Sequence, residues 1–207
     1  IRRNMPDHGS LSNDYPLPDD PFILVTTGGG GDGDVLIDWV LRAYESDAPP
    51  AYPALVLFGP FMQLETRHAF QERVNRLANV HSTTFEAHVE ELYGRALGVV
   101  AMGGYNTFCE ILSFGKPGLI VPRTVPRQEQ LLRAQRASEL GLVQYLEDDE
   151  IRDARTMASA IERMARSPRP DPLLLDRMLS GLDAISELSA PWLDEHHTEL
   201  RRANAGV

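Results

Sequence analysis

Six short, continuous apolar runs alternate along the chain with amphipathic segments, and this alternation limits the fold more than any other feature. The runs cover residues 22–27, 54–59, 80–85, 97–102, 118–122 and 142–146. Apolar residues recur at helical spacing in the segments between and after them, which are 34–44, 64–78, 89–96, 105–114, 128–141 and 149–167. Continuous apolar strands are typical of a parallel sheet that is covered on both faces. We therefore predict an α/β, Rossmann-like domain with about six parallel strands and helices on both faces.

The segments that flank this alternation have a different character. Residues 1–20 are polar, contain several prolines and show no period of either kind, which predicts a linker or an extended arm. Residues 171–207 begin with the helical pattern LLLDRMLSGLDAISEL and then turn polar. We expect this segment to be a C-terminal helical tail, and residues 21–170 to be the α/β domain.

The charge balance bears on what the domain binds. The 207 residues carry 30 acidic and 20 basic side chains, for a formal net charge of −10. We expect no nucleic-acid partner, because a protein that binds a phosphate backbone usually carries a basic stripe. One small anionic ligand, held locally, is still compatible with this charge.

Cysteine and histidine usage excludes other kinds of site. Cys109 is the single cysteine, so there is no internal disulfide, and a reducing, cytoplasmic location is the simpler expectation. His196 and His197 are sequence neighbours that face different ways on a helix, and we predict no metal site. No apolar run approaches the roughly 20 residues that span a bilayer.

The first apolar run leads into a glycine-rich loop, VTTGGGGDGD, at residues 25–34. Its spacing fits the dinucleotide pattern G-x-G-x-x-G at Gly28, Gly30 and Gly33. An NAD site also requires an acid near the end of the next strand, where it holds the ribose 2′-hydroxyl. The next run ends LVLFGPF without one, so the sequence argues against NAD.

Two other interpretations of this loop differ in how many glycines they explain. A tight turn with Asp32 or Asp34 as the helix N-cap accounts for one or two glycines. A loop whose backbone amides approach a phosphate at a helix N-terminus accounts for a longer run. We favour the phosphate loop, whose predicted binding residues are Gly28, Gly29, Gly30 and Gly31.

The most informative stretch is GVVAMGGYNTFCEILSFGKPGLIVPRTVPRQEQLLRAQRASELGL, at residues 98–142. It resembles the donor-binding C-terminal domain of GT-B glycosyltransferases, in the group of the N-acetylglucosaminyltransferase that forms lipid II and related predicted glycosyltransferases. The shared pieces occur in the family's order, and they are Gly103-Gly104, Thr107, Glu110, Gly115-Lys116-Pro117, Pro122 and Glu129-Gln130. The resemblance extends over about residues 22–167, and it is the ordered set that makes it specific.

This resemblance implies roles for the helix that follows Gly103. In the family the matching glutamate holds the ribose, which assigns that role to Glu110. The amides from Gly104 to Thr107, including Asn106, would face a phosphate at the helix start. An alternative stays open, because TFCE is also a capping box with Thr107 as N-cap and Glu110 bonded back to it.

The resemblance also implies roles for residues outside this helix. Glu129 and Gln130 would face the hydroxyls of the donor sugar, or would simply form a solvated helix N-terminus. Arg123 and Arg127 would neutralise a diphosphate, although surface arginines are common. Phe85 matches the position where the family reads the nucleobase through its backbone, and a core aromatic is the alternative.

The implied activity is the transfer of a hexose-type sugar from a nucleotide diphosphate sugar, a UDP-sugar by the resemblance, to an acceptor hydroxyl. Amides and helix N-termini would stabilise the diphosphate in place of a metal, and no cofactor is expected beyond this co-substrate. The general base would come from an N-terminal acceptor-binding domain. The chain begins without an initiator methionine, so we expect the donor half of a longer enzyme, inactive alone, with any peripheral membrane attachment through the other half.

Two other functions rank below this one. UDP-N-acetylglucosamine 2-epimerases share the fold, and their SGG-x-QEE and R-x-x-T-E-R-P-E segments partly match MGGYNTFCE and RTVPRQE. The chain lacks the paired acids of the first segment and the acid that precedes Arg in the second. A non-catalytic nucleotide-binding module is the alternative from a different class.

Overall fold

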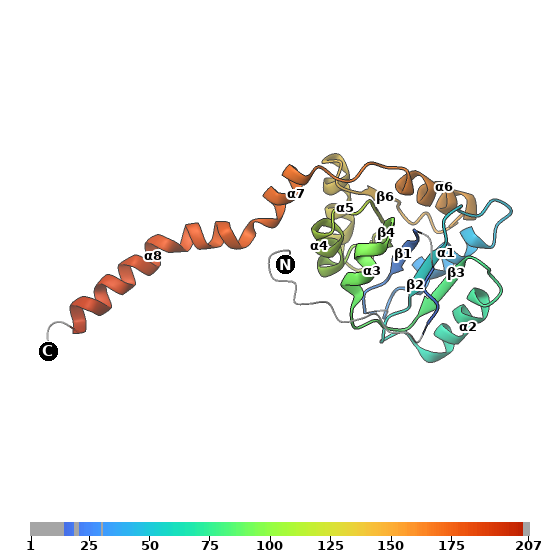
Figure 1. Ribbon diagram of the computed structural model, residues 1–207, viewed down its shortest axis with the longest axis horizontal. Coiled ribbons are helices and arrows are strands. Elements are labelled where there is room, and N and C mark those ends of the chain that lie inside the picture. Colours follow the sequence, from blue (N-terminus) through green and yellow to red (C-terminus); the bar gives the residue numbers. More distant parts are fainter. Residues whose placement is uncertain (1–14, 19–20, 30, 205–207) are drawn as a thin grey trace. The chain divides into compact units, whose positions relative to one another are not determined.

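The computed structural model describes residues 15–18, 21–29 and 31–204, with side chains described up to residue 192. Its centre is a single sheet whose strands lie in the order β3-β2-β1-β4-β5-β6 (Figure 1). Every neighbouring pair of strands is parallel, as predicted. The strands are β1 (Ile23–Thr26), β2 (Ala54–Leu57), β3 (Val80–Thr83), β4 (Gly98–Ala101), β5 (Gly118–Ile120) and β6 (Gln144–Tyr145).

Six helices cover the two faces of this sheet. They are α1 (Asp34–Tyr44), α2 (Leu64–Val74), α3 (Val89–Arg95), α4 (Tyr105–Ser113), α5 (Glu129–Glu139) and α6 (Ala154–Ala165). Figure 1 shows α1, α2 and α6 on one side of the sheet and α3, α4 and α5 on the other. Right-handed crossovers require this arrangement, because the strand order runs outward in one direction from β1 and in the other direction from β4.

Burial along the strands explains why they are continuous apolar runs. Each residue of the four central strands β1, β2, β4 and β5 is buried. The edge strands β3 and β6 are only partly buried, and they carry the polar side chains of His81, Ser82 and Gln144. A strand with helices on both faces has no solvent side, so its sequence does not alternate between apolar and polar residues.

Helix α1 is enclosed on more than its sheet-facing side because α6 packs along it. Ile37, Trp39 and Leu41 are all fully buried, although they point in different directions around the helix. The indole Nε1 of Trp39 donates to the backbone carbonyl of Asp153, at 2.8 Å. This bond fixes the start of α6 against α1.

Helix α6 starts later than the sequence predicts. The expected start was residue 149, but Glu150 and Arg152 have φ angles of 64° and 52°, in the left-handed region that a helix cannot include. Asp153 is the N-cap, and its carboxylate accepts the Thr156 amide at 2.8 Å. The acidic turn before the helix therefore forms local side-chain to backbone bonds in place of helical ones.

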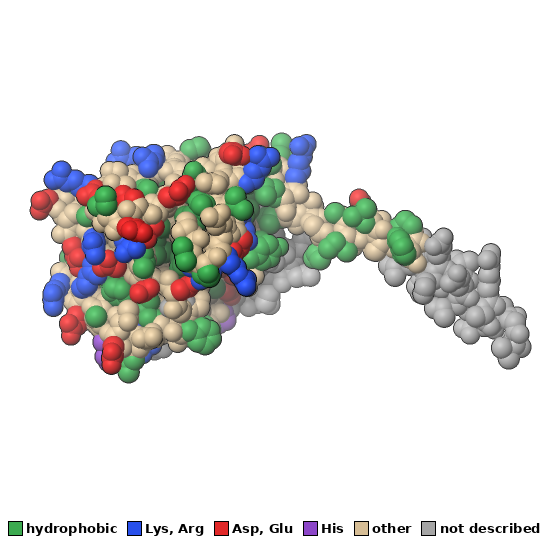
Figure 2. All heavy atoms as spheres, turned by 180° about the vertical axis from the view of Figure 1, so that it is seen from behind, with side chains coloured by type: hydrophobic (Ala, Val, Ile, Leu, Met, Phe, Trp, Pro, Cys, Tyr) green, Lys and Arg blue, Asp and Glu red, His purple; other side chains and the backbone are tan. Residues whose placement is uncertain are grey.

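The two ends of the chain differ from the sheet domain. Within the predicted arm, Tyr15 donates its hydroxyl to Glu86 at 2.8 Å and Arg95 donates to the carbonyl of Pro18 at 3.4 Å. The C-terminal unit begins at Pro172 and contains α7 (Pro172–Leu179) and α8 (Gly181–Asn204). Figure 2 shows acidic and basic side chains interspersed on one face of the sheet domain, and apolar side chains exposed along the C-terminal unit.

Candidate functional site

A cleft of about 280 Å³ lies at the carboxyl ends of β1 and β4, the neighbouring strands from which the strand order runs in opposite directions. Ligands of doubly wound sheets bind at this switch point. The lining comes from the last residue of β1 and the loop after it, the loop after β4 with the start of α4, and one residue of α5. These residues are Thr26, Thr27, Gly28, Gly29, Asp32, Met102, Gly103, Gly104, Tyr105, Asn106, Thr107 and Gln130.

The two glycine loops that the sequence singles out face each other across this cleft. Gly28 has a φ of +67°, and a Cβ placed there would lie 3.7 Å from the hydroxyl of Thr107. The amide of Gly28 also bonds to the Thr26 hydroxyl at 3.3 Å. The backbone of the first loop can therefore approach the second loop without an intervening side chain.

The turn from β1 into α1 depends on Gly33. A Cβ at this position would overlap Cβ and Cγ2 of Thr27, whose hydroxyl is itself held by the Phe58 carbonyl at 3.0 Å. Gly33 is also the N-cap of α1, and no side chain caps the helix. The alternative in which Asp32 or Asp34 is the N-cap is therefore wrong.

Helix α4 directs its N-terminus into the cleft. Its N-cap is Gly104, and the helix begins at Tyr105. The first amides of a helix have no acceptor within it, and in α4 these amides belong to Tyr105, Asn106 and Thr107, which line the cleft. The capping-box alternative is wrong, because Thr107 lies inside the helix, two residues after its first residue.

Glu110 lies one turn further along α4 and faces α3. The Tyr93 hydroxyl hydrogen-bonds its carboxylate, which does not line the cleft in this structure. Burial raises the pKa of Glu110, the Tyr93 bond lowers it, and the charge of Glu90 raises it again. Burial likewise raises the pKa of Tyr93, and the neighbouring carboxylate adds to that rise. The predicted ribose contact of Glu110 stays a prediction.

Gln130 lines the cleft, and Arg123 lies next to it. Gln130 is buried, and its side-chain oxygen accepts the backbone amide of Arg123 at 3.0 Å. The Arg123 guanidinium forms an ion pair with Asp32 of the loop after β1. The predicted arginine therefore lies at the edge of the cleft, where its partner is an acid of this chain.

Other predicted residues lie away from the cleft lining. Gly31, Arg127 and Glu129 are exposed, and Phe85 is 61% exposed in the loop after β3. The core alternative for Phe85 is therefore wrong, while the ligand-binding roles of these four residues stay predictions. Gly30 lies outside the described residues.

Arg133 was not among the predicted site residues, and it holds the loop after β4 in place. Its Nη1 donates to the carbonyl of Gly103 at 2.7 Å. The guanidinium carbon lies 5.7 Å from the ring centroid of Tyr105 and 5.9 Å from that of Phe108. A signal was present, because Gln130 and Arg133 are three residues apart and so share a helix face.

Lys116, in the Gly-Lys-Pro motif, has a structural role. Its side chain is buried, and its Nζ donates to the carbonyls of Gly94 and Ala96 at 2.8 and 2.7 Å. Burial lowers the pKa of this amine. The lysine ties the end of α3 to the turn before β5, which places the motif in the scaffold of the site.

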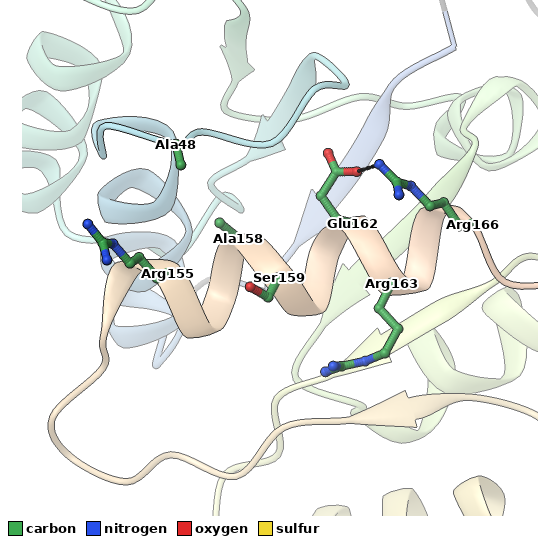
Figure 3. Close-up of a pocket in the computed structure, with 7 residues that line it drawn as sticks. All are labelled: Ala48, Arg155, Ala158, Ser159, Glu162, Arg163 and Arg166. Atoms are coloured by element: carbon green, nitrogen blue, oxygen red, sulfur yellow. Dashed lines mark hydrogen bonds and ion pairs between the residues drawn. The ribbon is translucent and has the colours of Figure 1, made fainter.

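A larger hollow, of about 440 Å³, lies along α6 and the connection between α1 and β2 (Figure 3). Three arginines line it, but Figure 3 shows their guanidinium groups directed to different sides, and Arg166 pairs with Glu162 at 2.9 Å. Ala48 belongs to the connection that leads into β2, which is the amino edge of the sheet. Because ligands bind beyond the carboxyl edge, we assign the site to the smaller cleft.

Two features are absent from the part of the chain that the structure describes. No group of three or more His, Cys, Asp or Glu side chains in it is close enough to hold a metal ion. Among its helices, none is both long and apolar enough to cross a bilayer.

Residues 22–172 match the sequence model of the glycosyltransferase family 28 C-terminal domain. No curated protein matches the chain.

Solved structures with a similar fold include three glycosyltransferases. The calicheamicin glycosyltransferase CalG4 has a TM-score of 0.56 and 22% identity, over 90% of this chain and 44% of its own. The spinosyn forosaminyltransferase SpnP has a TM-score of 0.58 and 18% identity, over 84% and 44%. MurG of Acinetobacter baumannii has a TM-score of 0.52 and 14% identity, over 77% and 50%. At such low sequence identity the similarity shows a shared fold and nothing more. The chain spans half the length of these structures or less.

Proposed function

Because the chain belongs to the glycosyltransferase family 28 C-terminal domains, we propose that its cleft binds the nucleotide diphosphate sugar of a glycosyl transfer. The observation that carries this proposal is the convergence of two glycine loops and the N-terminus of α4 at the switch point of the sheet. Backbone amides and a positive helix end suit a diphosphate. The family match favours sugar transfer over epimerisation as the reaction.

In this proposal the cleft stabilises the leaving diphosphate. Negative charge grows on the nucleotide as its bond to the sugar breaks, and the fixed amides at the start of α4 meet that charge without reorganising. Glu110, one turn beyond these amides, is the proposed ligand of the ribose hydroxyls. To reach them, its carboxylate must give up part of its bond with Tyr93.

The partner of this domain is the acceptor-binding N-terminal half of a GT-B enzyme. The solved glycosyltransferases are about twice the length that this chain covers, which supports a second domain. The general base that deprotonates the acceptor hydroxyl belongs to that half in our proposal. The single cysteine, Cys109, supports a cytoplasmic enzyme, which cell fractionation of the tagged full-length protein would check.

Titration calorimetry with the chain tests the choice of ligand. We expect UDP and UDP-sugars to bind more tightly than GDP-sugars and NAD, and UDP to bind more tightly than its 2′-deoxy form. NAD binding that is tighter than UDP binding would overturn the proposal, and so would the absence of any nucleotide binding.

A matched pair of glycine variants tests the position of the diphosphate. A Cβ meets nothing within 4 Å at Gly104, which lines the cleft, or at Gly94, which is in α3. Gly104→Ala should weaken UDP binding about tenfold, a loss of about 1.4 kcal/mol. The reason is that the added methyl group would lie beside the amides of α4. Gly94→Ala should leave UDP binding unchanged. Equal effects of the two variants would contradict this position.

A further inference from the structure

An ion pair joins two loops that flank the cleft. Asp32 lies in the loop after β1, and Arg123 follows β5, 91 residues later. Because β4 lies between β1 and β5 in the sheet, the pair reaches across the carboxyl end of β4. This is the strand end from which the Gly103 loop and α4 start.

Asp32 gives the cleft an unexpected charge. Among the described residues that line the cleft, it is the single side chain that is charged at neutral pH, and it is an acid. An anionic ligand at the start of α4 would meet this carboxylate as well as the favourable amides. The carboxylate therefore opposes the ligand that the rest of the cleft suits.

The backbone of Arg123 is held in place, while its guanidinium does not use all of its hydrogen-bond donors. Gln130 holds the backbone amide at 3.0 Å. The guanidinium binds Asp32 through Nη1, while its buried Nε–H has no hydrogen-bond partner among the residues that the structure describes. A guanidinium can bind two phosphate oxygens side by side, which a single bond to Asp32 does not use.

The pair is also exposed enough to be exchanged. The side chain of Asp32 is 49% exposed and that of Arg123 is 34% exposed. Ion pairs at such positions contribute little to stability, because water screens them. A diphosphate, with more charge than one carboxylate, can therefore replace Asp32 as the partner of Arg123.

We propose that Asp32 is an internal counter-ion that competes with the donor's diphosphate for Arg123, and so sets how much negative charge a ligand must bring to bind. The proposal rests on the proposed function, since the diphosphate is that of the donor. Arg123 attracts the ligand and Asp32 opposes it. A purely structural pair, which only holds the two loops together, would favour the ligand through both residues.

Calorimetry on the full chain separates these two roles, with inorganic pyrophosphate, UDP and uridine as probes. We expect Asp32→Asn to raise the affinity for pyrophosphate and for UDP about fivefold at low ionic strength, and to raise it less at high salt. Arg123→Met should weaken both probes, and uridine should respond to neither change. Asp34→Asn, which removes the same charge from the first turn of α1, is the control and should have a smaller effect.

Three results would overturn the proposal that Asp32 is a counter-ion. These are weaker or unchanged pyrophosphate binding by Asp32→Asn, equal tightening by Asp34→Asn, and no pyrophosphate binding by any variant. The proposed function is judged separately from the same data. UDP that binds no more tightly than pyrophosphate would contradict a nucleotide site and leave the counter-ion standing, provided that Asp32→Asn tightens pyrophosphate.

Discussion

At Gly33, in the turn from β1 into α1, the packing leaves no room for a side chain. The third glycine of the dinucleotide pattern allows close packing of helix and strand, and here the neighbour that a Cβ would overlap is Thr27. The NAD pattern is therefore matched for a structural reason, which holds whatever ligand the loop binds.

Replacing Gly33 should cost stability. We expect Gly33→Ala to lower the free energy of unfolding by about 2 kcal/mol, as overpacking in a tight site does. Urea denaturation measures this loss. Gly31→Ala is the control, since a Cβ there meets nothing within 4 Å and should change stability by less than about 0.5 kcal/mol. Similar losses for both variants would contradict the steric explanation.

Glu110 should make stability depend on pH in a defined direction. Because burial raises its pKa, the folded state binds this proton more tightly than the unfolded state does. Its contribution is therefore fully present below the ordinary pKa of 4.5 and is lost as the pH rises through the raised value. Glu110→Gln removes the ionisation but keeps an acceptor for Tyr93.

We expect the melting temperature of Glu110→Gln to equal or exceed that of the natural chain at pH 7. The advantage should shrink as the pH falls toward 4.5, which differential scanning calorimetry across this range would record. A variant that is clearly less stable at pH 7 would mean that the ionised carboxylate stabilises the fold.

At the scale of elements, α5 positions two polar side chains on two different loops. Gln130 holds the loop after β5 through the Arg123 amide, and Arg133 holds the loop after β4 through the Gly103 carbonyl. One helix thus sets the distance between the two loops, and a shift of α5 would move both.

Removing the Arg133 contact should loosen the donor site more than the fold. We expect Arg133→Met to weaken UDP about fivefold, since the Gly103 carbonyl loses its donor and the loop its orientation, a change of about 1 kcal/mol. Arg136→Met is the control, because Arg136 lies on the exposed side of α5 and pairs only with Glu139 among its described partners. Calorimetry should find no change in the affinity of the control for UDP. Equal losses of affinity in the two variants would contradict a positioning role for Arg133.

At the scale of the whole molecule, the chain consists of two units, and the cleft belongs entirely to the first. Helix α8, in the second unit, has four exposed large apolar side chains among those described, with Leu182, Ile185, Leu188 and Trp192 between 62% and 78% exposed. Exposed apolar side chains contribute little to the stability of a fold.

Because the sheet domain is a compact unit by itself, a chain that ends at Ser180 should keep this domain intact. We expect its melting temperature to lie within about 2 °C of the full chain and its affinity for UDP to be unchanged. Scanning calorimetry and titration measure the two quantities. A large drop in either would mean that the sheet domain does not fold as an independent unit.

The order of elements was predictable because it depends on local pattern. The helix expected at 34–44 is α1 with the same bounds, and the strands expected at 22–27 and 118–122 contain β1 and β5. The start of α6 was not predictable from apolar periodicity, since side-chain bonds of the preceding acidic turn compete with helix formation there.

The candidate site was predictable in part for the same reason. Glycine loops and helix starts such as Gly28 and Asn106 can be identified by eye, because the sequence itself determines which residues follow a strand. The pairing of Asp32 with Arg123, and of Arg133 with Gly103, could not be identified. These partners are 91 and 30 residues apart, and only the sheet order brings them together.

The sequence by itself determined that this chain forms a parallel α/β sheet, with glycine loops at the carboxyl ends of its first and fourth strands. Local patterns suffice for that, because burial on two faces and backbone freedom leave direct marks on residue type. Only the tertiary structure decided that Glu110 faces Tyr93, that Arg133 holds the Gly103 carbonyl, and that Asp32 pairs with Arg123 beside the cleft. Such contacts depend on where distant strands lie in the sheet, and no single segment of the sequence carries that information.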